Sequence, residues 1–273
     1  MMQFLSTISQ RILIFGSSLS ILVALFALIS PQMAYANVPT PPNSAGYIAQ
    51  GARGEYREAA VGVVVPTLSA GSPTITMSVS LGGVDQGLVQ VTTELISSIG
   101  SGGTQSNGVW WSETINKQPQ GGPGAGYLDG PITINAGDIV WLYVSSNAHF
   151  TPGSGPNSPS YNGFQAKDMN SNVEVQHNTT DVASDSGGVS ATLAYSGPLR
   201  SNPPQLGFNY VNFYGFEVED YAGGNTSSSN PTVSGKWLSA NNLPTPAQAI
   251  QNNGIPATTS NMDPTGDFTV TSQ

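Results

Sequence analysis

Short stretches in which apolar and polar residues alternate recur along most of the chain. The clearest is Thr74 to Gly83, TITMSVSLGG, where Ile, Met, Val and Leu alternate with hydroxyl side chains. Alternation places the two kinds of side chain on opposite faces of a strand, so this stretch is predicted to be a half-buried β-strand. Further strands are predicted over 58–68, 87–94, 108–116, 139–144, 172–177, 189–195, 213–221 and 232–240.

Turn-forming residues separate these strands, and the chain contains 32 Gly and 20 Pro. Asn135 to Asp138 is predicted to be a turn, and Phe150 to Tyr161 a loop. No window of helical periodicity is longer than Pro246 to Asn252. The pattern predicts an all-β fold, an antiparallel two-sheet β-sandwich of the concanavalin or lectin-like jelly-roll kind.

The first 36 residues have the features of a secretory signal peptide. Arg11 precedes an apolar run over 12–29, and Ala34-Tyr35-Ala36 is a typical cleavage signal. The alternative is an uncleaved anchor, because 18 residues lie at the lower limit of a membrane span. We expect cleavage and export, leaving one domain over 37–273 that begins with a proline-rich extended arm, 37–43.

The chain is acidic, with 16 Asp and Glu against 7 Lys and Arg. This balance argues against binding to nucleic acid or to anionic membranes. It suits work in acid, where most carboxylates are neutral and few positive charges remain to repel one another. Cysteine is absent, so the fold has no disulfide and no thiolate chemistry.

Three acidic residues gather within four positions of the strand Phe213 to Tyr221, FYGFEVEDY. Alternation puts Phe216 and Val218 on one face and the carboxylates of Glu217 and Glu219 on the other. Two such carboxylates lie about 7 Å apart, close enough for ionisation of one to hinder ionisation of the other. A solvated strand face or a calcium-binding end of a hairpin is the alternative interpretation.

A second strand, Gly87 to Glu94 (GLVQVTTE), places Gln90 and Glu94 on one face. Together the two stretches resemble the glutamic peptidases, the eqolisin family of acid endopeptidases. That family pairs a glutamine in an LQxGxD pattern with a glutamate in an IxED pattern. The matching residues here are Gln90, with Glu94 in place of the aspartate, and Glu219 followed by Asp220.

Other segments extend the resemblance over most of the chain after residue 42. Asn43 to Ala49 is similar to the family's opening NWxGY, Ile132 to Asp138 to its ITISxGD, and 260–273 to its terminal strand. The family's WVGIDG segment falls within Thr74 to Gly83, where neither its tryptophan nor its aspartate is present.

The resemblance implies a secreted, acid-active endopeptidase that needs no metal or other cofactor. Glu219 would be the general base and acid that activates water, and Gln90 would orient the water and stabilise the oxyanion. An amide suits this role because it offers one acceptor and two donors and does not titrate in acid. A carboxylate base with a pKa near ~4 is half ionised only in acid.

Three residues are predicted to support this site: Glu94, Trp111 and Glu113. Trp111-Ser112-Glu113 aligns with the family's WYE, and alternation places Trp111 and Glu113 on one face. An aromatic wall would desolvate the neighbouring carboxylate and raise its pKa. The alternative is that adjacent tryptophans fill the core, which is the interpretation adopted for Trp110.

Other hydrolytic chemistry finds little support in the sequence. His149 and His177 lack the spacing of zinc ligands, no GxSxG motif occurs, and Asp185-Ser186-Gly187 lacks the flanking apolar strand of aspartic peptidases. The expected partners are polypeptide substrates, without nucleic acid and without a membrane after leader cleavage, and the chain is expected to be a monomer. Two alternatives remain: a non-catalytic, lectin-like binding module, and a structural surface or matrix protein.

Overall fold

The computed structural model describes residues 43–51, 55–83, 89–115, 118–119, 124–147, 161–179, 186–197, 205–220 and 235–273. The predicted signal peptide and arm residues 37–42 lie outside this range. Within it, no helix has the length and apolar character needed to cross a membrane.

The described residues form sixteen strands and one short 3-10 helix, η1. Their bounds are β1 Ser44–Gln50, β2 Tyr56–Val64, β3 Thr74–Gly83, β4 Val89–Ile99, β5 Gln105–Ile115, β6 Gln118–Pro119, β7 Ala125–Tyr127, β8 Ile139–Asn147, β9 Tyr161–Asp168, β10 Val173–Thr179, β11 Ser186–Ser196, β12 Tyr210–Asp220, β13 Lys236–Ser239, η1 Ala240–Asn242, β14 Gln248–Asn253, β15 Ala257–Thr259 and β16 Phe268–Ser272.

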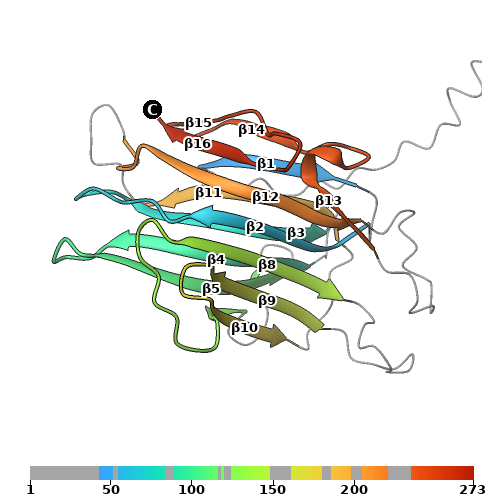
Figure 1. Ribbon diagram of the computed structural model, residues 1–273, viewed down its shortest axis with the longest axis horizontal. Helices are drawn as coiled ribbons and strands as arrows, with labels where there is room; N and C mark the ends of the chain where they lie inside the picture. Colours follow the sequence, from blue (N-terminus) through green and yellow to red (C-terminus); the bar gives the residue numbers. More distant parts are fainter. Residues whose placement is uncertain are drawn as a thin grey trace, which may run out of the picture. The chain divides into compact units, whose positions relative to one another are not determined.

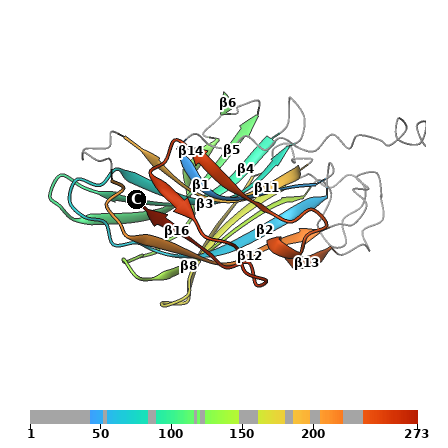
Figure 2. The ribbon, with the colours of Figure 1, turned by 90° about the horizontal axis from the view of Figure 1, so that it is seen from above.

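These strands build two antiparallel sheets of eight strands each, which lie in two layers (Figures 1 and 2). Sheet A has the order β14-β1-β11-β3-β4-β5-β6, with β7 paired to β5. Sheet B has the order β10-β9-β8-β2-β12-β16-β15, with β13 paired to β12. The predicted two-sheet β-sandwich is confirmed.

The inward faces of both sheets form one apolar core. In β3, Ile75 and Met77 are fully buried, and Phe213 of β12 stacks on Phe268 of β16 with ring centroids 4.5 Å apart. Burying side chains of this size stabilises the fold by about 1.5–3 kcal/mol each. The alternation read from the sequence therefore reflects one buried and one outward face per strand.

The predicted strand Thr74 to Gly83 coincides with β3. The turn before β8 is also confirmed, because a carboxylate oxygen of Asp138 accepts a hydrogen bond from the backbone N–H of Asn135 at 2.7 Å. Pro246 to Asn252, the longest helical window, is not helical: most of it belongs to β14, which pairs with β1. β9 was not predicted.

A bulge in β12 decides which of its acidic residues face outward. The register with β2 shifts between Tyr214 and Glu217, where Gly215 has a φ of +54°. This conformation is easy for glycine and uncommon for other residues. Beyond the bulge Phe216 and Val218 are fully buried, so Glu217 points away from the core.

Candidate active site

Gln90 lies near the start of β4 in sheet A and points away from the interior. Val91, Thr93 and Leu95 of the same strand are fully buried, so alternation directs Gln90 and Glu94 to the outward face. The prediction that these two residues share a face is confirmed.

Glu219 lies near the end of β12 in sheet B and also points outward. Its neighbour Val218 is fully buried against Ala59, the residue opposite it in β2. Glu217 and Glu219 therefore share the outward face, as the sequence predicts. Glu219 is nonetheless only 7% exposed, so other side chains on this face cover it.

The structure does not bring Gln90 and Glu219 together. β4 belongs to sheet A and β12 to sheet B (Figure 2). The buried neighbours in each strand show that each side chain leaves its sheet on the side away from the other sheet. Packed sheets lie about 10 Å apart, and the outward directions add the length of both side chains. One water molecule cannot bridge this span, so the expected dyad is not formed. Alternation fixes which residues share a face, but it does not fix which sheet a strand joins.

Glu219 instead lies beside Glu58, the residue directly opposite it in β2. Residues opposed in this way have Cβ atoms about 4.5–5.5 Å apart. Tyr143 of β8 completes the group, because Tyr143 and Glu58 lie near enough for each to influence the pKa of the other. We refer to Glu58, Glu219 and Tyr143 as the acidic cluster.

The protonation of the acidic cluster is set by burial and by like charge. Burial raises the pKa of Glu58, the charge of Glu219 raises it further, and the hydrogen bond from Tyr143 partly opposes the rise. Burial, followed by the charge of Glu58, also raises the pKa of Tyr143 well above its ordinary value. Two carboxyl groups that lie side by side and are partly buried favour a state in which they hold one proton between them.

Two aromatic rings lie near each other on the outward face of sheet B that carries Glu219. Trp237 of β13 is opposite Glu219 on the side of β12 away from β2, so three strand spacings, about 14 Å, separate the backbones of β13 and β8. The rings of Trp237 and Tyr143 nevertheless have centroids only 6.5 Å apart. Both side chains therefore extend toward each other across the outward face of β12 and β2, the face that carries the two carboxyl groups. We call this pair of rings the aromatic roof.

Trp111 and Glu113 share a face, as predicted, but it is the inward face of sheet A. Trp111 is 7% exposed and stacks on His177 of β10 at a centroid distance of 4.3 Å. Glu113 is 2% exposed and accepts hydrogen bonds from Asn162 at 2.7 Å and from the Thr179 hydroxyl. Both residues thus belong to the interior, on the face opposite to Gln90, and do not line a cleft with it.

Trp110 was predicted to fill the core, and this prediction is wrong. It lies on the outward face of sheet A, opposite Glu94 in the register of β4 and β5, and is not a core residue. Its ring lies 3.8 Å, centroid to centroid, from that of Tyr127 in β7. The core is filled by Trp111 instead.

The outward face of sheet A is rich in hydroxyl groups. The Ser78 and Thr192 hydroxyls are 3.0 Å apart, and the Ser112 hydroxyl donates to Glu94 at 3.3 Å. Burial raises the pKa of Glu94, and this hydrogen bond partly offsets the rise. Four residues, about 13 Å of strand, separate Glu94 from Gln90, so Glu94 does not replace Glu219 as a partner for the amide.

Asp220 also differs from its acidic neighbours, because it points into the interior and is 7% exposed. One of its carboxylate oxygens is buried without a hydrogen-bond partner among the described residues. Burial raises the pKa of Asp220. The acidic stretch of β12 therefore supplies only Glu217 and Glu219 to the outward face.

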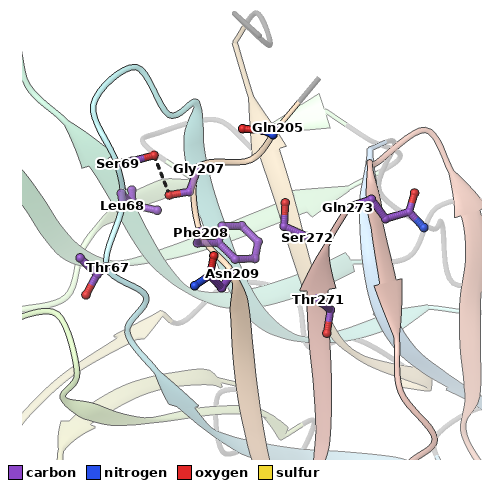
Figure 3. Close-up of a pocket in the computed structure, with 10 residues that line it drawn as sticks. All are labelled: Thr67, Leu68, Ser69, Gln205, Gly207, Phe208, Asn209, Thr271, Ser272 and Gln273. Carbon is purple, nitrogen blue, oxygen red and sulfur yellow. Dashed lines mark hydrogen bonds between the residues drawn. The ribbon is translucent and has the colours of Figure 1, made fainter. Parts of the chain in front are cut away.

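A pocket of about 650 Å³ lies at the other end of β12 (Figure 3). It is lined by Thr67, Leu68, Ser69, Gln205, Gly207, Phe208, Asn209, Thr271, Ser272 and Gln273. None of these has a titratable side chain, and about 30 Å of strand separates Asn209 from Glu219. The pocket therefore contributes no acid or base to the acidic cluster. Among the described residues, no group of three or more His, Asp or Glu side chains is placed to hold a metal ion.

Glu58 and Tyr143 are the site residues that sequence analysis missed. Glu58 opens the predicted strand over 58–68, and Tyr143 lies within the one over 139–144. The sequence did offer one signal for Glu58: it is a carboxylate at the start of a strand whose other residues are almost entirely apolar. Without the pairing of β2 with β12, nothing in the sequence connected Glu58 to Glu219.

Comparison with known proteins bears on the fold. No protein-family model matches the chain, and no curated protein matches it significantly. Among solved structures, scytalido-glutamic peptidase with a peptide-based transition-state analog is 16% identical, with a TM-score of 0.56, and the match covers 85% of this chain and 99% of that one. SCP-B, a member of the eqolisin family of peptidases solved with the tripeptide Ala-Ile-His, is also 16% identical, with the same coverage and a TM-score of 0.52. The chain therefore has the two-sheet fold seen in the glutamic peptidases.

Proposed function

We propose that this protein is a secreted, acid-active hydrolase of peptide bonds, in which the acidic cluster performs the chemistry. The observation that carries the proposal is the cross-strand pair of Glu58 and Glu219 with the Tyr143 hydroxyl on Glu58. A partly buried carboxyl pair that shares a proton is suited to general acid and base catalysis. The fold is shared with enzymes whose solved complexes contain peptides or peptide-like inhibitors.

The two carboxyl groups take complementary roles. Ionised Glu219 removes a proton from a water molecule while the water oxygen bonds to the peptide carbonyl carbon. Glu58, whose pKa is raised by burial and by Glu219, carries the proton that passes to the amide nitrogen as the C–N bond breaks. Transfer of a proton from Glu219 to Glu58 restores the starting state, so the cycle consumes one water molecule and no cofactor.

Tyr143 holds the acid in place. Its hydroxyl lies near the Glu58 carboxyl and can donate to it, while Glu58 carries the transferable proton. The raised pKa of Tyr143 keeps it a neutral donor over the whole acidic range. Its role is to orient Glu58 rather than to exchange protons itself.

Gln90 has no part in this mechanism, because it faces outward from the other sheet. The wide separation of Gln90 and Glu219 also favours a second candidate function, a β-sandwich binding module without hydrolytic activity. In that case the outward face of sheet B, with Trp237 40% exposed and Tyr214 38% exposed, would bind ligand without cleaving it.

Digestion of casein and haemoglobin between pH 2 and 7 tests the proposal, with pepstatin and a chelator as inhibitor controls. Glu219→Gln and Glu58→Gln should each lower the rate by about 10²–10⁴-fold, the usual contribution of a general acid or base. Glu217→Gln is the matched control, since Glu217 lies on the same strand and face without belonging to the cluster. Gln90→Ala should leave the rate unchanged.

The opposite pattern would overturn the mechanism: loss of activity in Gln90→Ala with full activity in Glu58→Gln. Absence of proteolysis by the wild-type protein over the whole range would sink the hydrolase proposal. Retained binding of peptide or polysaccharide would then select the binding module. Urea unfolding of each variant separates a loss of chemistry from a loss of fold.

A further inference from the structure

Trp237 stands in an unusual place for an aromatic residue. β13 has only four residues and, among the described strands, pairs with β12 alone. Its tryptophan does not turn into the core but extends along the outward face until its ring centroid lies 6.5 Å from that of Tyr143. Glu219 and Glu58 are neighbours of Trp237 in one cross-strand row, and Tyr143 lies two residues along β8 from that row, opposite Ala60.

Trp237 and Glu219 are neighbours in this cross-strand row but differ widely in exposure. Trp237 is 40% exposed, whereas Glu219 beside it is 7% exposed, although both point to the same outward side. An outward glutamate on a sheet face is ordinarily solvated, so a cover must exclude water from it. Trp237, the cross-strand neighbour of Glu219 in β13, has its indole ring directed along this face toward Tyr143, which places the aromatic roof to contribute to that cover.

We infer that Trp237 is a positioning residue for the reaction: its indole excludes water from Glu58 and Glu219, and so sets the pH range in which this pair holds a single proton. Desolvation disfavours the second negative charge and strengthens the repulsion between the carboxylates. The inference rests on the proposed function only where it concerns rate. The covering of the carboxyl pair can be tested on an inactive protein.

Several charged and titratable groups surround Glu58 in addition to Trp237. Besides Glu58, the described charged or titratable side chains on β2, β8, β9, β12 and β13 are Tyr56, Arg57, Tyr143, Lys167, Asp168, Tyr210, Tyr214, Glu217, Glu219, Asp220 and Lys236. Substituting Trp237 leaves all of them in place. A change in the titration of Glu58 would therefore report the loss of the ring.

Trp141 offers a matched control on the same face. It lies beside the glycines of the outward surface, where a Cβ atom at Gly62 would come within 3.1 Å of its ring and one at Gly215 within 3.3 Å. It belongs to neither the acidic cluster nor the aromatic roof. Trp141→Ala thus removes an indole of the same size from the same sheet face without uncovering Glu58.

The test is NMR titration of the glutamate side-chain carboxyls in wild type, Trp237→Ala, Trp237→Phe and Trp141→Ala, with Glu58→Gln to assign the signal. In Trp237→Ala the Glu58 titration should move to lower pH, Trp237→Phe should restore much of it, and Trp141→Ala should match wild type. In the rate assay, Trp237→Ala should lose about tenfold in kcat on the alkaline side of the optimum, where Glu58 releases its proton early.

An unmoved Glu58 titration in Trp237→Ala overturns the inference, as does an equal shift in Trp141→Ala. If no variant and no wild-type protein hydrolyses peptide, the proposed function fails while the titration result still stands by itself. If hydrolysis occurs but its pH profile is the same in wild type and Trp237→Ala, the inference fails while the proposed function stands.

Discussion

Removing the buried carboxylate of Glu113 should destabilise the whole sandwich. Glu113 projects from β5 of sheet A and accepts hydrogen bonds from Asn162 of β9 and Thr179 of β10, both in sheet B. It therefore links the two layers through their interior, at a position that is only 2% exposed. Asn162 also accepts a hydrogen bond from Ser146 at 2.8 Å, which extends the link to β8.

The magnitude follows from the groups left behind. Glu113→Ala leaves two buried donors, the Asn162 amide and the Thr179 hydroxyl, without their acceptor, and each unsatisfied group costs about 1–3 kcal/mol. Release of the carboxylate's own desolvation cost offsets part of this sum. We expect a net loss of about 3 kcal/mol, which lowers the Tm of a chain of this size by about 6–12 °C.

Urea unfolding followed by tryptophan fluorescence measures the loss directly, and Trp111 beside Glu113 provides a local probe. Thr179→Val should cost about 1 kcal/mol, since it removes one of the two hydrogen bonds. Glu94→Ala is the control, because Glu94 is an outward carboxylate of the neighbouring strand with one long hydrogen bond, at 3.3 Å. A midpoint for Glu113→Ala no lower than that of Glu94→Ala would refute the role of Glu113 as a link between sheets.

Two further outcomes follow from the structure. Burial raises the pKa of the carboxyls of Glu58, Glu94 and Asp220. A group whose pKa is raised on folding stabilises the protein below its unfolded-state pKa, and this stability is lost as pH rises through its folded-state pKa. The urea midpoint should therefore be higher at pH 4 than at pH 7, although the lowered pKa values of Asp168 and Asp263 act in the opposite sense. A lower midpoint at pH 4 would contradict the expectation. Gly46→Ala should destabilise the protein by several kcal/mol, because Gly46 has a φ of +141° and a Cβ atom there would lie 2.2 Å from the Ala191 carbonyl oxygen of β11. A Tm equal to that of wild type would show that β1 can shift to accommodate the methyl group.

Much of the fold could be predicted from the sequence, because alternation reports local geometry. The bounds of β3 and the common face of Gln90 and Glu94 follow from the period of two residues per strand. β9, which begins at Tyr161, was missed, because its sequence YNGFQAKD alternates small, polar and apolar residues without a clear period. Tertiary pairing with β8 and β10 makes it a strand.

The site was harder to predict than the fold, because it depends on which strands become neighbours. Glu219 was identified correctly as an outward carboxylate, but its partner was sought in β4, and the residue opposite it in the sheet is Glu58 of β2. Gln90 and Glu219 each lie in the expected local pattern, and neither pattern contains information on sheet order. Pairing between strands distant in sequence is settled by the packing of the whole core.

The shortness of β13, which has four residues, bears on how often solvent reaches the acidic cluster. A short strand at a sheet margin, held by one neighbour, opens by local fraying at a far smaller free energy than the central strands require. With Trp237 covering the carboxyl pair as we infer, each such excursion would admit solvent to Glu58 and Glu219 while the rest of the molecule stays intact. Hydrogen exchange at Trp237 and access of water to the carboxyl pair should therefore share one rate, independent of global unfolding.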